Sequence, residues 1–198
     1  MTTPDVWIAT RSGKRFTPLK PQTDQIELTD IAAALSKICR YTGQCDRFYS
    51  VAEHSVRTLW AAERVVKGIG GKDPADTARN RSNLLRWALL HDAAEAYLCD
   101  VAAPIKSAPQ FALYRTLERG IEKTIAQRFK LPPAMPPEVT ILDRLMLASE
   151  WPILMPKTQD PWGGKFPKPD LTLVENIGWT PATAEAHFLS AAGDLGIR

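Results

Sequence analysis

The sequence predicts an all-α protein, a helical bundle of five to seven helices preceded by a short β-hairpin. First, apolar residues recur every three or four positions between Phe111 and Phe129, as on one face of an amphipathic helix. Second, Ser50 and Thr180 stand before helical segments as N-caps, since both side chains can accept a hydrogen bond from the first turn. Third, extended and turn-rich sequence is gathered in the N-terminal extension, residues 1–28. These features favour a bundle of helices.

The N-terminal part of the chain holds the predicted hairpin and two helices. Two short segments, Val6–Thr10 and Lys14–Thr17, flank Arg11-Ser12-Gly13, in which Gly13 suits the turn of a hairpin. Residues 29–39 begin with two capping residues and continue with helical apolar spacing. A second helix starts after Ser50, where Glu53 three positions on completes a capping-box pattern.

Farther along, helices alternate with connections rich in glycine or proline. A glycine-rich loop at residues 68–73 ends the second helix, and the next begins near residue 74 or 82 and runs into residues 84–100. Pro104 interrupts an extended connection. The remaining predicted helices are residues 111–129, 138–151 and 181–192. Residues 155–180 are rich in proline and tryptophan and long for a structureless loop, so a lid, a partner surface and mobility are all open.

Length and composition predict a single domain over residues 1–198. A net charge of +3 is too small to indicate nucleic acid or an anionic membrane as a partner. No apolar run reaches the length of a membrane span, and the N-terminus lacks the pattern of a signal peptide. The three cysteines form no CxxC motif, which suits a reducing compartment. We therefore expect a cytoplasmic protein.

The segment 84–100 places ionisable groups where an apolar helix would otherwise continue. After a run of apolar helix formers it presents His91, Asp92 and Glu95. Burying such groups costs several kcal/mol unless each is paired or binds a metal. On a helix, Glu95 would lie three and four residues beyond the other two, so all three can face one site. Two interpretations of this segment therefore remain: a metal or reaction site, and a solvated helix face.

Two more residues could complete a metal site. His54 lies early in the helix after Ser50, and Asp143 is a single acid within an apolar helical pattern. Two imidazoles and two carboxylates suit one divalent transition ion (Mn, Co, Zn, Fe or Ni) better than Mg or Ca. The four residues are far apart in the sequence, so their spacing alone does not decide the question.

These residues carry a resemblance to a known family. The order His54, His91-Asp92, Asp143 on separate helices resembles the ligand pattern of HD-domain metal-dependent phosphohydrolases. The local sequences that resemble the family, and within it the small 5′-deoxynucleotidase branch, are Ser50–Ser55, Leu89–Glu95 with Asp100 and Pro104-Ile105-Lys106, and Leu142-Asp143-Arg144 with Ala148-Ser149-Glu150. The resemblance covers residues 30–155.

The resemblance implies an HD-domain bundle and an enzyme that hydrolyses phosphate esters of nucleotides. The metal ligands it implies are His54, His91, Asp92 and Asp143. Glu95 would orient or deprotonate the attacking water, and Asp100 would be a second acid–base group or would hold a ligand. Arg40 and Lys106 would contact the substrate phosphate, with Arg47 as an alternative.

Three activities remain open. The first is a 5′-deoxynucleotidase that converts deoxynucleoside monophosphates to deoxynucleosides and phosphate. The second keeps the metal site but releases triphosphate from deoxynucleoside triphosphates. The third is a non-catalytic module that binds metal and nucleotide as a sensor. From the family we also expect a homodimer, with the nucleotide as its small-molecule partner.

Overall fold

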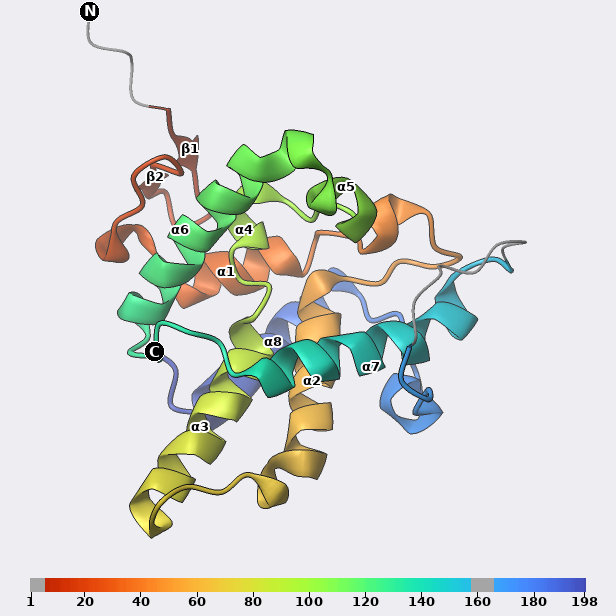
Figure 1. The fold of residues 1–198 in the computed structure, drawn as a ribbon. Coiled ribbons are helices and arrows are strands. Elements are labelled where there is room, and N and C mark those ends of the chain that lie inside the picture. Colours follow the sequence, from red (N-terminus) through yellow and green to blue (C-terminus); the bar gives the residue numbers. More distant parts are fainter. Residues whose placement is uncertain (1–5, 158–165) are drawn as a thin grey trace, which may run out of the picture.

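Helix α2 (Val51–Val65) is the central element of the bundle (Figure 1). It packs against α3 (Pro74–Leu90), α7 (Pro137–Leu154) and α8 (Pro181–Asp194). The structure is a computed structural model and describes residues 6–157 and 166–198. Within these residues the all-α class is confirmed, as is the N-terminal hairpin of β1 (Ile8–Ala9) and β2 (Arg15–Phe16).

Shorter helices complete the bundle around α2 and α3. In chain order these are α1 (Leu28–Leu35), α4 (Glu95–Leu98) and α5 (Ala103–Ser107), and the long α6 (Ala112–Arg128) follows them. The described residues also form short 3₁₀ helices, which are η1 (Thr23–Gln25), η2 (Tyr41–Gly43), η3 (Val66–Gly68), η4 (Pro109–Phe111) and η5 (Leu171–Val174). Figure 1 shows α4, α5 and α6 on the same side of the molecule as α1 and the hairpin.

Several predicted boundaries need correction. Helix α1 ends at Leu35 and not at residue 39, because Cys39 forms a β-bridge with Ser50 that requires extended backbone. Pro104 lies in the first turn of α5, where a missing N–H costs nothing, so it starts a helix instead of interrupting an extended connection. Residues 155–180 contain η5, and the part from 158 to 165 lies outside the described residues.

The start of α2 shows one confirmed cap and one that fails. The Ser50 hydroxyl accepts from the Glu53 backbone N–H at 3.1 Å, as the sequence predicts. The Glu53 side chain does not complete the capping box, because it pairs with Arg57 at 2.8 Å and accepts from the backbone N–H of Gly178 and Trp179. Both members of this ion pair are buried. The pair therefore fastens the segment before α8 to the central helix.

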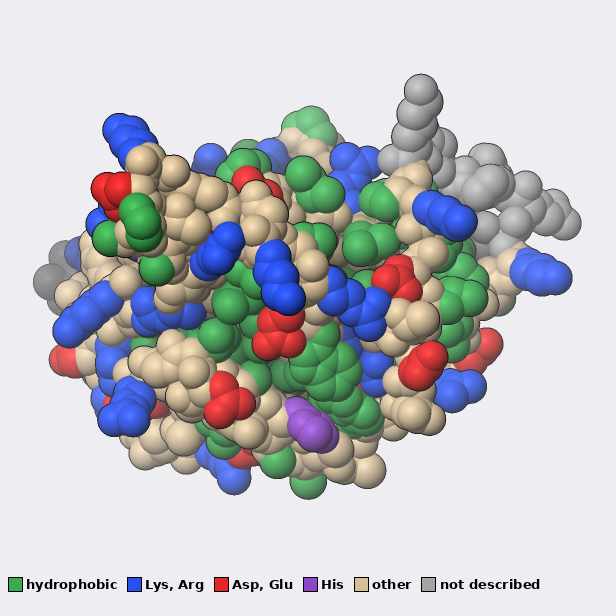
Figure 2. Space-filling model, turned by 90° about the horizontal axis from the view of Figure 1, so that it is seen from below, with side chains coloured by type: hydrophobic (Ala, Val, Ile, Leu, Met, Phe, Trp, Pro, Cys, Tyr) green, Lys and Arg blue, Asp and Glu red, His purple; other side chains and the backbone are tan. Residues whose placement is uncertain are grey.

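The surface carries charges of both signs. On the face turned into view in Figure 2, basic and acidic side chains are interspersed around an apolar area, and neither sign forms a continuous field. In the described part of the chain, none of the helices combines the length and apolar composition that a membrane crossing needs.

Candidate metal centre

The backbone changes its hydrogen-bond pattern where the apolar helix meets the ionisable residues. Helix α3 ends at Leu90, and the next bonds span three residues: Ala93 N–H donates to Leu90 O and Glu95 N–H to Asp92 O, both at 3.0 Å. The prediction that His91, Asp92 and Glu95 share one continuous α-helix is therefore wrong. In a 3₁₀ turn, residues three apart eclipse one another, which directs Asp92 and Glu95 toward the same side.

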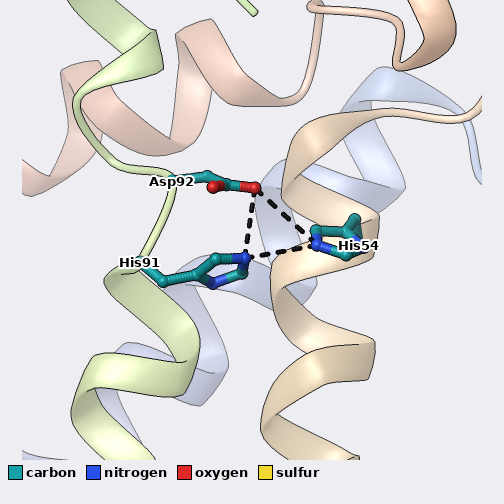
Figure 3. A group of neighbouring side chains, drawn as sticks. All are labelled: His54, His91 and Asp92. Atoms are coloured by element: carbon teal, nitrogen blue, oxygen red, sulfur yellow. Dashed lines mark hydrogen bonds and ion pairs between the residues drawn. The ribbon is translucent and has the colours of Figure 1, made fainter. Parts of the chain in front are cut away.

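His54, His91 and Asp92 converge on one point (Figure 3). The Nε2 atoms of the two histidines are 3.2 Å apart. Asp92 Oδ2 lies 3.1 Å from Nε2 of His91 and 3.7 Å from Nε2 of His54. Both imidazoles are buried. With three ligand atoms this close together, the group could hold a metal ion.

The opposite nitrogens of the two rings are already engaged. Nδ1 of His91 lies 2.9 Å from the carbonyl oxygen of Ala88, and Nδ1 of His54 lies 2.6 Å from Oε1 of Glu150. Metal-binding histidines donate their second ring N–H in this way, which fixes the ring and leaves the other nitrogen for the ion. Both Nε2 atoms are therefore oriented as ligands.

The fourth predicted ligand lies beside the cluster. Asp143, on α7, places Oδ1 at 3.1 Å from Nε2 of His54 and 4.0 Å from Nε2 of His91. Its side chain is 41% exposed, so it forms the outer rim of the group. All four predicted ligand residues thus meet, although the compact set of three is His54, His91 and Asp92.

The carboxylates favour protonated imidazoles when no ion is bound. Burial lowers the pKa of His91, but Asp92, together with Asp143 and the Ala88 carbonyl, more than reverses this and raises it to about 9. Burial acts against ionisation of Asp92, yet His91, His54 and Arg40 hold its pKa below the usual range. A metal ion would take the place of these protons.

A cleft with a volume of about 370 Å³ opens beside the cluster. Six of the eight predicted site residues line it, namely Arg40, Asp92, Glu95, Asp100, Lys106 and Asp143, whereas His54 and His91 do not. Apolar side chains that include Leu147, Trp151 and Met155 form another part of its wall. The alternative phosphate contact, Arg47, is exposed and is not part of this lining. The volume falls within the range of small-molecule sites.

Glu95 has the environment of an acid–base group. It is 5% exposed, and its Oε1 accepts from Lys106 Nζ at 3.3 Å. Its Oε2 finds no hydrogen-bond donor among the residues that the structure describes. Burial, reinforced by Asp92 and Asp100, raises the pKa of Glu95. Burial also raises the pKa of Asp100. A carboxylate with a free oxygen and a raised pKa can accept a proton from a ligand in the cleft.

No role was predicted for Glu150, Tyr41 or Tyr49. Glu150 accepts from the hydroxyl of Tyr41 at 2.7 Å and from that of Tyr49 at 2.8 Å, in addition to its contact with His54. One signal was available, because Glu150 follows Asp143 by two helical turns and therefore lies on the same face of α7.

Fold and cluster together define a helical protein with two buried histidines and a half-buried aspartate that could hold a metal ion. The chain belongs to the family of the uncharacterized protein YfdR of Escherichia coli, to which it is 36% identical over 159 residues, or 75% of this chain and 78% of YfdR. It is also 36% identical over 135 residues to an uncharacterized protein of Rhodobacter capsulatus, and the aligned residues make up 66% of this chain and 61% of that protein. A search against models of protein families finds no match.

Proposed function

We propose that this protein is a metal-dependent phosphohydrolase of the HD-domain type that releases phosphate from deoxynucleoside 5′-monophosphates. The observation that carries the proposal is the convergence of His54, His91 and Asp92 at a cleft that also presents Glu95. The sequence resemblance to the 5′-deoxynucleotidase branch supplies the reaction class.

The donor set fits a divalent transition ion. Two imidazole nitrogens and one or two carboxylate oxygens suit Mn, Co, Zn, Fe or Ni, whereas Mg prefers oxygen ligands alone. His54, His91, Asp92 and Asp143 would hold the ion. A bound divalent ion would withdraw charge from a phosphoryl oxygen and lower the pKa of water toward neutrality.

The other predicted site residues in the cleft would transfer protons or position the substrate. Oε2 of Glu95 is free to take a proton from the attacking water, and Lys106 fixes the other oxygen of that carboxylate. Asp100, also in the cleft, would act as a second acid–base group. Arg40, whose side chain is 13% exposed, presents a guanidinium that can bind phosphate oxygens through two N–H groups.

The charge of the cleft favours a monophosphate over a triphosphate. The described residues that line it include four carboxylates and two cations, Arg40 and Lys106. Lys106 is shared between Glu95 and Glu118, and Arg40 lies between Asp92 and Glu150. One divalent ion offsets the excess of carboxylates, and a monoester phosphate adds a charge of about −1.5 to −2. A triphosphate would bring further negative charge to an acidic lining.

The test is phosphate and triphosphate release from a panel of nucleoside mono- and triphosphates. Chelator-stripped protein would be assayed with and without Mn, Co, Zn or Mg. Metal-restored release of inorganic phosphate from deoxymonophosphates supports the proposal, and release of triphosphate would replace it with the triphosphohydrolase. Binding of metal without any turnover would favour the sensor.

A pair of variants separates acid–base chemistry from a general effect of charge. Glu95→Gln should lower kcat by about 10²- to 10⁴-fold while metal binding persists. Glu118→Gln is the matched control, since Glu118 contacts the same lysine at 2.7 Å but lines a smaller neighbouring cavity of about 150 Å³ instead of the cleft that holds Arg40 and Asp100. Its kcat should stay within about tenfold of the wild type. Equal effects of the two substitutions would remove Glu95 from the mechanism.

A further inference from the structure

Glu150 is a fully buried carboxylate to which the proposed reaction assigns no task. Its exposed fraction is 0%, and four groups surround it. Oε1 accepts from Tyr49 Oη at 2.8 Å and from His54 Nδ1 at 2.6 Å. Oε2 accepts from Tyr41 Oη at 2.7 Å and lies 3.4 Å from Arg40 Nε. A buried ion is tolerated only with partners of this kind.

One oxygen of Glu150 fixes a metal-holding ring. Because a carboxylate oxygen accepts, Oε1 holds a proton of His54 at Nδ1 and leaves Nε2, which faces Asp92 and His91, as the nitrogen for an ion. Partners of this kind typically change metal affinity by about 10- to 100-fold when they are removed.

The other oxygen of Glu150 faces a cation of the cleft. Arg40 spans two carboxylates, with Nε near Glu150 and Nη1 at 3.6 Å from Asp92 Oδ2. These two contacts, made by different nitrogens of the guanidinium, favour one direction for the Arg40 side chain.

The same oxygen also holds the loop that carries Arg40. Tyr41 and Thr42 have φ values of 57° and 52°, a region that side chains other than glycine rarely adopt. Such a conformation persists only where surrounding contacts impose it. The hydrogen bond from Tyr41 Oη to Glu150 is one such contact, made between residues 109 positions apart.

We propose that Glu150 is a positioning residue that couples the metal-holding imidazole of His54 to the phosphate-binding guanidinium of Arg40. The inference rests on the proposed function, since it takes Arg40 as the group that meets a phosphate. Substitution of Glu150 is expected to weaken metal binding and anion binding together, although Glu150 itself touches neither ligand.

An amide at position 150 should disturb the contacts with both His54 and Arg40 without creating a cavity. Glutamine keeps the volume but brings an NH₂ group into a pocket of donors. With the amide oxygen toward His54, the NH₂ would face Arg40, which then loses its buried counter-charge. We expect Glu150→Gln to weaken binding of inorganic phosphate to the Co²⁺-loaded protein by about tenfold and binding of Co²⁺ by about tenfold or more.

A double-mutant cycle tests whether Glu150 acts through Arg40. Co²⁺ affinity would be read from the visible spectrum in phosphate-free buffer, and phosphate affinity from its change on adding inorganic phosphate. Four proteins are compared: wild type, Glu150→Gln, Arg40→Met and the double variant. If Glu150 positions Arg40, the first substitution should cause no further loss of phosphate affinity once Arg40 is replaced. Losses that simply multiply, or an unchanged phosphate affinity in Glu150→Gln, would overturn the proposal.

A milder variant covers the case in which Glu150→Gln does not fold. Tyr41→Phe removes one hydrogen bond to Oε2 and leaves the contact between His54 and Glu150 intact. It should weaken phosphate binding several-fold with Co²⁺ affinity unchanged, and the opposite pattern would refute the division of roles. None of these readouts uses turnover, so an absence of nucleotidase activity would count against the proposed function and leave the coupling to be judged by the cycle.

Discussion

Binding of a metal ion to the cluster should release protons. With a pKa of about 9, His91 is expected to be mostly protonated at pH 7 in the metal-free protein. An ion that occupies Nε2 must displace this proton. We therefore expect about one proton to be released from His91 at pH 7, and a tenfold gain in apparent metal affinity for each pH unit up to about 9.

The assay is calorimetric titration with Co²⁺ or Zn²⁺ in two buffers of different ionisation enthalpy, repeated from pH 6.5 to pH 9.5. The difference in apparent enthalpy between the buffers counts the protons. Release of clearly less than half a proton at pH 7 would mean that His91 is already neutral, and the electrostatic description of the cluster would be refuted.

The same proton affects folding stability. The folded pKa of His91 lies above the unfolded value of 6.5, so its contribution is full below pH 6.5 and is lost as the pH rises through about 9. A change from 6.5 to about 9 corresponds to about 3 kcal/mol. Chelator-treated protein should therefore lose up to about this much unfolding free energy between these pH values, measured by urea denaturation. Metal-saturated protein, in which the ion replaces the proton, should not show this loss.

Substitutions at three positions test other parts of the structure. Asp92→Ala should abolish both metal content, measured by elemental analysis, and any hydrolase activity, because it removes a ligand from the compact set. Arg57→Met should lower the free energy of unfolding in urea by about 3–5 kcal/mol, since it leaves Glu53 buried without its cation. A loss below about 1 kcal/mol would mean that the backbone donors of Gly178 and Trp179 suffice for that carboxylate. Ser50→Ala should cost about 1 kcal/mol and Ser50→Gly only a few tenths; equal losses would argue against the cap.

Local signals in the sequence predicted much of the fold and the centre of the site. The hairpin, the cap at Ser50 and helix α6 depend on neighbouring residues, so short-range patterns suffice for them. The gathering of His54 and Asp143 with His91-Asp92 was an inference from residue types and from resemblance. This inference required only that the helices carrying these residues be predicted, because ionisable groups that are buried among apolar residues need one another as partners.

Features that depend on distant contacts were not predictable in this way. Ala93 and Ala94 are good helix formers, so no local sequence signal predicts that α3 ends at Leu90. Three partners of Glu150, namely Arg40, Tyr41 and Tyr49, come from the segment before α2, and the fourth, His54, lies on α2, all about a hundred positions earlier in the chain. A single glutamate near the end of an apolar helix does not specify which donors surround it.

The long separations within the site also order its assembly in time. His54 and His91 leave the ribosome well before Asp143 and Glu150, and the segment that accepts hydrogen bonds from Arg57 follows 116 positions after it. These contacts are non-local, since the residues that make them lie far apart in the chain. A metal ion held by the cluster would stabilise the folded bundle, and a free concentration of 100 times Kd would add about 2.7 kcal/mol to stability. The stability of the folded protein would then depend on the supply of that ion.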